Sequence, residues 1–159
     1  MIRVMTPAPG DRADIADVVV SRRYPVPIDA VWAELTEPDR LSRWYGTYTG
    51  VGGPGGTVEL TVTGEVDAGG EIGAPTAVGI VECEAPWRLV VDIGEAPSPW
   101  HLALTLSAES GATVLLLTQR PVEGVSTEDL VAGWSWYLER LAASLADEPM
   151  PAWEGGPGS

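Results

Sequence analysis

The most regular pattern in the chain is a hydrophobic stripe near its C-terminal end, between Ser126 and Asp147. Its large apolar side chains recur at alternating steps of three and four residues, as on one face of an α-helix: Val131, Trp134, Leu138, Leu141 and Leu145. A helix over this span is roughly 30 Å long. Ser126 with Asp129 three residues later is typical of a helix N-cap, and Pro149 follows the expected end. The pattern predicts one long helix whose stripe must pack against another element.

Between residues 57 and 120 apolar and polar positions alternate with a period of two, as in strands with one buried face. Together with a β-branched run near the N-terminus, this predicts six strands, at Asp17–Tyr24, Thr57–Thr63, Thr76–Glu84, Arg88–Ile93, Trp100–Ser107 and Thr113–Arg120. Turn-forming residues separate them, so we expect an antiparallel meander and an α+β fold. The sets expected to face the long helix are Val58, Leu60 and Val62; Leu89, Val91 and Ile93; Leu102, Leu104 and Leu106; and Val114, Leu116 and Thr118.

Two short helices are expected between the first two strands, at Ile28–Leu35 and Asp39–Trp44, because Pro27 suits a first helical turn and apolar residues recur at helical spacing. Residues 1–13 and 148–159 lack periodicity, and we predict that both are flexible. We therefore predict a single domain over residues 14–147.

Residues 46–56 are rich in glycine, and Gly50, Gly52 and Gly55 formally match the G-x-G-x-x-G pattern. A dinucleotide-binding turn has a strand before it and a helix after it, whereas a strand pattern follows here. The chain also lacks the Gly-Lys-Ser/Thr of a P-loop. We therefore predict a flexible loop and no phosphate site.

Composition limits the possible partners. The chain has 159 residues, 45% of them hydrophobic, which suits one domain with a core. Its 23 acidic and 9 basic residues give a net charge of −14, so nucleic acid and anionic membrane surfaces are poor partners. There is no apolar run long enough to span a bilayer and no secretion signal, so we expect no membrane insertion and a cytoplasmic location.

Residues suited to catalysis or metal binding are scarce. His101 is the only histidine, and its alternation with Leu102 predicts an outward position. Cys83, the only cysteine, is expected to face inward as a small apolar side chain, on the same side as Val81. Glu82 and Asp92 are expected on the solvated outer face. No metal-ligand spacing appears, so we predict neither a catalytic residue nor a cofactor.

The order of strand, two short helices, five strands and long helix resembles the helix-grip fold of the START-like (SRPBCC) superfamily. Pro27-Ile-Asp-Ala-Val-Trp32, then Leu35-Thr-Glu-Pro38, Leu41 and Trp44, resemble the N-terminal signature of the family related to the activator of heat-shock protein 90 ATPase. Further matches follow in family order: Gly79-Ile-Val-Glu82, Pro86-Trp-Arg-Leu89, Gly111-Ala-Thr113 and Gly133-Trp134. The resemblance covers about residues 15–146. It implies a sheet curled around the long helix and an apolar cavity for a lipid, a polyketide or another hydrophobic molecule.

The candidate cavity residues combine inward strand positions with aromatic and apolar residues of the helices and the segments beside them. They are Trp32, Trp44, Tyr48, Leu60, Val91, Leu104, Leu116, Thr118, Arg120, Trp134, Tyr137 and Leu138, with Tyr45 as a further aromatic candidate. Arg120 is a candidate to bind a carboxylate or hydroxyl of a ligand at a polar end of the cavity. Helical spacing alone predicts core packing for Trp134, whereas Tyr48 and Tyr137 stay open between core and cavity. Gly133 is expected to let the helix approach the sheet closely or to leave room for a ligand.

Three functions fit this picture. We favour non-catalytic binding of a hydrophobic small molecule. An enzyme similar to polyketide cyclases and aromatases would need converging inward polar residues, which the alternation does not supply. A module similar to the chaperone co-activator would act on a chaperone or another protein through an exposed patch, which is not obvious in this acidic chain. Both a monomer and a homodimer are compatible with the sequence.

Overall fold

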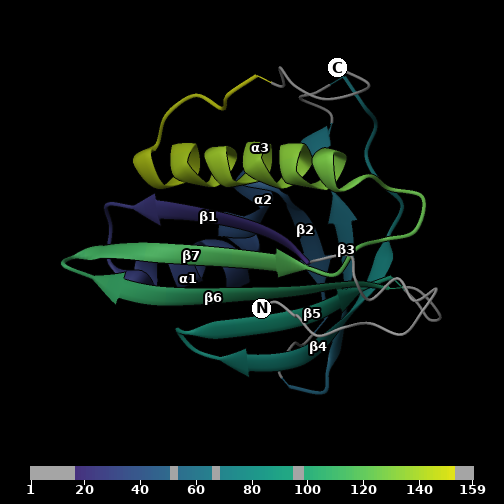
Figure 1. The fold of residues 1–159 in the computed structure, drawn as a ribbon, viewed down its shortest axis with the longest axis horizontal. Coiled ribbons are helices and arrows are strands. Elements are labelled where there is room, and N and C mark those ends of the chain that lie inside the picture. The colour runs from purple at the N-terminus through teal and green to yellow at the C-terminus, as the bar shows by residue number, and fades with distance from the viewer. Residues whose placement is uncertain (1–16, 51–53, 66–68, 95–98, 153–159) are drawn as a thin grey trace, which may run out of the picture.

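The computed structural model describes residues 17–50, 54–65, 69–94 and 99–152 (Figure 1). The elements are β1 (Val18–Tyr24), α1 (Ile28–Thr36), α2 (Pro38–Trp44), β2 (Gly46–Thr49), β3 (Thr57–Val62), β4 (Thr76–Glu84), β5 (Arg88–Ile93), β6 (Trp100–Glu109), β7 (Ala112–Gln119) and α3 (Thr127–Ala146). The predicted lead at 1–13, Gly52 of the glycine-rich motif, parts of two turns and the end of the predicted tail lie outside the described residues. No helix in the described ranges is long and apolar enough to cross a bilayer.

The strands form one antiparallel sheet in the order β1-β7-β6-β5-β4-β3-β2. The predicted number of six strands is wrong, because the described residues form a sheet of seven. The additional strand is β2, which the sequence pattern assigned to the glycine-rich loop. It pairs with β3 and places Tyr48 opposite Leu60. The other strands and all three helices begin and end within about two residues of their predicted bounds.

The two short helices carry the chain from one edge of the sheet to the other. β1 and β2 are the edge strands, and the chain between them runs through α1 and α2. At one edge α3 packs beside β1, while α2 contacts both β2 at the other edge and α3. Figure 1 shows α3 along β1, with β7, β6 and β5 following on the side away from the helix. The sheet therefore curls, and its inner face is turned toward the helices.

The buried stripe of α3 differs from the prediction at its first position. Burial is confirmed for Trp134, Leu138 and Leu141. Val131, however, is 41% exposed, and Leu130 takes its place in the core. A Cβ atom at Gly133 would have no atom within 4 Å, so close approach to the sheet is not the reason for this glycine.

Both flanks of α3 are held by hydrogen bonds. The backbone N–H of Asp129 donates to the Ser126 hydroxyl oxygen at 3.0 Å, which confirms the predicted N-cap. Beyond the C-terminus, the Trp136 indole N–H donates to the carbonyl oxygen of Pro151 at 3.1 Å, and Met150 packs against the core. The described part of the predicted flexible tail thus lies back on the helix.

On β7 the predicted inward face is wrong. Leu115, Leu117 and Gln119 are buried, whereas Leu116 is 39% exposed. Residues 114–117 are all apolar, so the local pattern does not decide which of the two faces is buried. Pairing with β6 decides it, because Leu117 lies opposite the inward-facing Leu104.

A bulge in β4 explains a second difference. The pairing with β5 shifts between Ile80 and Glu82, so Val81 is an extra residue in the ladder. A bulge changes which positions share a face beyond it. Cys83 therefore faces inward together with Ile80, as expected for the cysteine. Val81 was expected on the same side but is 46% exposed.

Candidate functional site

A cavity of about 360 Å³ lies between the inner face of the sheet and the three helices. Its walls contain no Asp, Glu, His, Lys or Arg among the described residues. They consist of Leu35, Thr36, Leu41, Trp44, Tyr45, Tyr48, Val58, Leu60, Val78, Ile80, Cys83, Leu89, Val91, Ile93, Leu102, Leu104, Leu117, Trp134 and Leu138. The volume and the apolar lining are both within the usual range for small-molecule sites.

The structure brings many of the predicted cavity residues together. Seven of the predicted residues line the cavity: Trp44, Tyr48, Leu60, Val91, Leu104, Trp134 and Leu138. The other five do not line it: Trp32, Leu116, Thr118, Arg120 and Tyr137. Because the inward positions of β7 are the odd-numbered ones, Thr118 is not directed toward the lining, and Arg120 is exposed beyond the strand end. The expectation that Arg120 forms a polar end of the cavity is therefore wrong.

Several lining residues were missed because they come from short or irregular segments. Leu35 and Leu41 belong to the stripes of the two short helices, and Thr36 is at the end of the first. The two leucines could have been predicted, since the apolar stripe of a helix must face the sheet. Ile80 and Leu117 were obscured by the bulge in β4 and by the unbroken apolar run in β7.

The indole groups at the cavity wall are already paired within the protein. The Trp134 Nε1–H donates to Oε1 of Gln119 at 2.6 Å, and the Trp44 Nε1–H donates to the backbone carbonyl of Glu34 at 3.0 Å. Gln119 is fully buried, and the hydrogen bond that its Oε1 accepts from Trp134 accounts for a polar residue at this inward position at the end of β7. These bonds orient both indole rings.

The hydroxyl groups of the wall differ from one another. Thr36 donates to the carbonyl of Trp32 at 2.9 Å, and the Tyr48 hydroxyl donates to the carbonyl of Thr36. The Tyr45 hydroxyl makes no hydrogen bond with any residue that the structure describes. Cys83 adds a free thiol, which is only a weak donor.

Tyr45 is held in an aromatic cluster at one end of the cavity. Its ring is stacked on Trp134, with centroids 5.8 Å apart, and meets the ring of Tyr137 edge-on at 4.8 Å. The Tyr137 hydroxyl donates to the carboxylate of Glu65. Burial raises the pKa of Tyr45 above its ordinary value, and the negative charge of Glu65 raises it further. The Tyr45 hydroxyl is thus a protonated donor at neutral pH.

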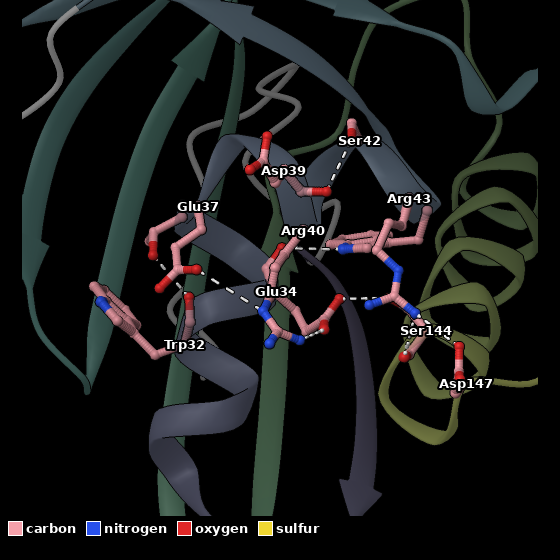
Figure 2. Close-up of polar contacts among 11 residues, drawn as sticks. Trp32, Glu34, Glu37, Asp39, Arg40, Ser42, Arg43, Ser144 and Asp147 are labelled. Atoms are coloured by element: carbon pink, nitrogen blue, oxygen red, sulfur yellow. Dashed lines mark hydrogen bonds and ion pairs between the residues drawn. The ribbon is translucent and has the colours of Figure 1, made fainter.

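A buried polar network supports the helical wall from behind (Figure 2). The Glu34 carboxylate is fully buried; it accepts hydrogen bonds from the Ser144 hydroxyl at 2.8 Å and from the Arg40 guanidinium at 3.2 Å. Arg43 donates to the Ser144 carbonyl at 3.1 Å and reaches Asp147 at 3.4 Å. The network ties α1 and α2 to the C-terminal end of α3.

Two pairs of ionisable side chains are in contact on the outer face of the sheet. His101 Nδ1 lies 2.6 Å from Asp92 Oδ1, on the face opposite Leu102, as the alternation predicted. The Arg88 guanidinium contacts Glu82 at 3.0 Å. No group of three or more His, Cys, Asp or Glu residues suited to a metal ion occurs among the described residues.

Titration of the tyrosines gives a first test of this packing. The chain has four tyrosines, and burial is the main cause that raises the pKa of each: Tyr24, Tyr45, Tyr48 and Tyr137. The pKa values of Tyr24, Tyr45 and Tyr137 are strongly raised, so we expect no phenolate absorbance from these three in the folded protein at pH 10.0, the ordinary value, whereas all four tyrosines should titrate near it in denaturant. The pKa values of the tyrosines are higher in the folded protein than in the unfolded chain. Their contribution to the free energy of unfolding is therefore fully present below pH 10.0 and is lost as the pH rises through the folded values. A tyrosine that ionises normally in the folded protein would contradict its burial.

The curled antiparallel sheet, the two short helices and the long helix over an apolar cavity define a helix-grip protein of the START-like (SRPBCC) superfamily. More narrowly, the model of the Activator of Hsp90 ATPase homolog 1-like protein family matches residues 25–146, and the chain belongs to this family. A comparison with curated proteins found no match.

Solved structures show the same fold. The protein encoded by gene BPP1335 from Bordetella parapertussis is 27% identical, with a TM-score of 0.72 over 91% of this chain and 82% of that chain. CalU16 from Micromonospora echinospora is 24% identical, with a TM-score of 0.66 over 82% of this chain and 76% of that chain. DynU16, a putative protein in the dynemicin biosynthetic locus, is 22% identical, with a TM-score of 0.70 over 86% of this chain. The match spans 49% of DynU16, about half of its length.

Proposed function

We propose that the protein binds a hydrophobic small molecule, such as a lipid, a polyketide or an aromatic compound, in the cavity between α3 and the sheet, without catalysing a reaction on it. The observation that carries this proposal is the cavity itself, about 360 Å³ of space with an almost entirely apolar lining. An apolar occupant gains contacts with the lining atoms and is itself removed from water.

The size of the cavity limits the occupant. An engineered apolar cavity of about 150 Å³ holds one benzene molecule. A volume of about 360 Å³ therefore matches a ligand on the order of two fused rings, or a short chain of similar volume. A full-length membrane lipid would have to leave part of its chains outside.

Catalysis is less well supported, because the groups that it needs do not meet at this site. General acid–base chemistry requires a titratable side chain within hydrogen-bond reach of the reacting atoms. Among the described residues, the lining offers only tyrosine hydroxyls and the Cys83 thiol as titratable groups, and burial raises the pKa values of Tyr45 and Tyr48 away from neutral pH. The cyclase-like or aromatase-like alternative is therefore disfavoured, because the described lining residues include no base suited to neutral pH.

Binding is tested by native mass spectrometry and by thermal shift with lipids, polyketides and small aromatic compounds. A ligand present at one hundred times its Kd should raise the melting temperature by about 5–10 °C. Failure of every compound to bind or to stabilise the protein would overturn the proposal.

A matched pair of variants tests the place of binding. Leu104→Trp puts a large ring into the cavity, whereas Leu116→Trp makes the same change on the neighbouring strand at the outer face. We expect Leu104→Trp to weaken ligand binding at least about tenfold without loss of thermal stability, since the ring fills existing space. Leu116→Trp should bind as the wild type does. Equal affinities of the two variants would place the ligand elsewhere.

A further inference from the structure

The polar groups of the cavity wall restrict the chemistry of its occupant. The wall indoles and the hydroxyls of Thr36 and Tyr48 all donate to acceptors within the protein. Tyr45 and Cys83 are the exceptions among the described lining residues: the Cys83 thiol is only a weak donor, whereas the Tyr45 hydroxyl is a strong donor that makes no hydrogen bond within the described residues. An apolar site with one well-placed polar group is typical of a site that fixes the orientation of its ligand.

Tyr45 is also rigidly placed. Its backbone N–H donates to the Leu41 carbonyl at 2.9 Å, and its carbonyl accepts from the backbone N–H groups of Thr63 at 3.0 Å and Gly64 at 3.1 Å. Its ring is fixed by the contacts with Trp134 and Tyr137. Because both the backbone and the ring of Tyr45 are fixed, its hydroxyl loses little conformational freedom when it donates to a ligand.

The electrostatics of the cavity disfavour a negatively charged ligand. No Arg, Lys or His is found among the described lining residues, so a bound carboxylate would have no opposite charge to offset its loss of hydration. The Glu65 carboxylate, which accepts from the Tyr137 hydroxyl beside Tyr45, adds repulsion. A fatty acid or an aromatic acid is therefore disfavoured by the same cavity that accepts its uncharged analogue.

From these observations we infer that the ligand is an uncharged, flat aromatic molecule whose carbonyl or ether oxygen accepts a hydrogen bond from the Tyr45 hydroxyl. This inference rests on the proposed function, because it concerns the occupant of the same cavity. Three aromatic rings, those of Trp44, Tyr45 and Trp134, line the cavity and favour a planar aromatic ligand, since stacked and edge-on contacts between rings add to the gain from burial.

Three naphthalenes substituted at the same ring position test this inference about the ligand: acetylnaphthalene, ethylnaphthalene and naphthoate. They have similar shapes, but the first carries a neutral acceptor, the second none, and the third a negative charge. Isothermal titration calorimetry at neutral pH should show the ketone binding about five to ten times more tightly than the hydrocarbon. Naphthoate should bind at least about ten times more weakly than the ketone.

Tyr45→Phe should remove the advantage of the ketone and leave the affinity for ethylnaphthalene within about twofold of the wild type. Tyr137→Phe is the matched control: it deletes a hydroxyl from the neighbouring ring, which does not line the cavity, and should keep the preference for the ketone. Persistence of that preference in Tyr45→Phe, or equal binding of naphthoate and ketone, would overturn the inference. Equal binding of ketone and hydrocarbon by the wild type would overturn it while the proposed function stands. If neither these compounds nor any lipid or polyketide binds, both are overturned.

Discussion

Replacement of Glu34 by alanine is expected to lower the free energy of unfolding by about 3 kcal/mol. The substitution leaves the buried Ser144 hydroxyl without its acceptor at 2.8 Å and opens a small void between α1 and α3. Loss of the ion pair with Arg40 contributes less to this destabilisation than loss of a fully buried pair would, because the Arg40 side chain is 47% exposed. Urea denaturation measures the loss, and calorimetry should show melting about 6–12 °C lower.

Glu37→Ala is the matched control. Glu37 approaches the same arginine, at 3.8 Å, but its side chain is 62% exposed. Its removal should change the free energy of unfolding by less than about 0.5 kcal/mol. Glu34→Gln, which keeps the volume and an acceptor for Ser144, should lie between the two alanine variants. If Glu34→Ala were as harmless as Glu37→Ala, the buried network would not be what holds the two short helices to α3.

This network also shows what a sequence pattern does not report. Glu34 and Ser144 are 110 residues apart, and their contact depends on how α1 and α3 meet in space. A charged residue in a short helix is normally solvated, so its complete burial follows from a partner that no local pattern identifies. The same holds for Gln119, whose inward position is explained by the indole of Trp134.

Regular elements were predictable because their period is unambiguous. Most of α3 and the strands β3, β5 and β6 present apolar residues at a clear spacing, and the order of the elements along the chain was sufficient to indicate the helix-grip fold. Where the period is ambiguous, the prediction was wrong. The unbroken apolar run at 114–117 allows either face of β7 to be buried, and Leu130 and Val131 are adjacent apolar residues that differ only in their angle around α3.

The aromatic end of the site was only partly predictable. Tyr45 and Tyr48 were recognisable as aromatic candidates, but β2, which contains Tyr48 and begins directly after Tyr45, is a four-residue strand inside a glycine-rich stretch. Such a short strand has too few residues to show an alternation. Its pairing with β3 depends on a glycine at its first position, and this dependence can be tested.

Gly46→Ala is expected to lower the free energy of unfolding by about 3 kcal/mol and to weaken ligand binding at the same time. A Cβ atom at this position would lie against the backbone carbonyl oxygen of Thr61 and 3.0 Å from the Cα atom of Val62. Backbone atoms of a paired strand cannot move aside as a flexible side chain can, so β2 must shift away from β3. Tyr45 and Tyr48 lie beside and within β2, so the aromatic wall of the cavity should move with it. Urea denaturation and calorimetric titration with acetylnaphthalene measure the two effects.

Gly79→Ala is the control, because Gly79 is also within a strand of the sheet but a Cβ atom there would have no atom within 4 Å. This variant should be as stable as the wild type or more stable by up to about 1 kcal/mol, since alanine loses less chain entropy on folding. Its affinity for the ligand should be unchanged. If Gly46→Ala and Gly79→Ala proved equally stable, β2 would not pack against β3 as closely as the structure shows. If Gly46→Ala lost stability but kept its affinity, the position of the aromatic wall would not depend on this strand pairing, and the rigid placement of Tyr45 would have to come from α2 and α3 alone.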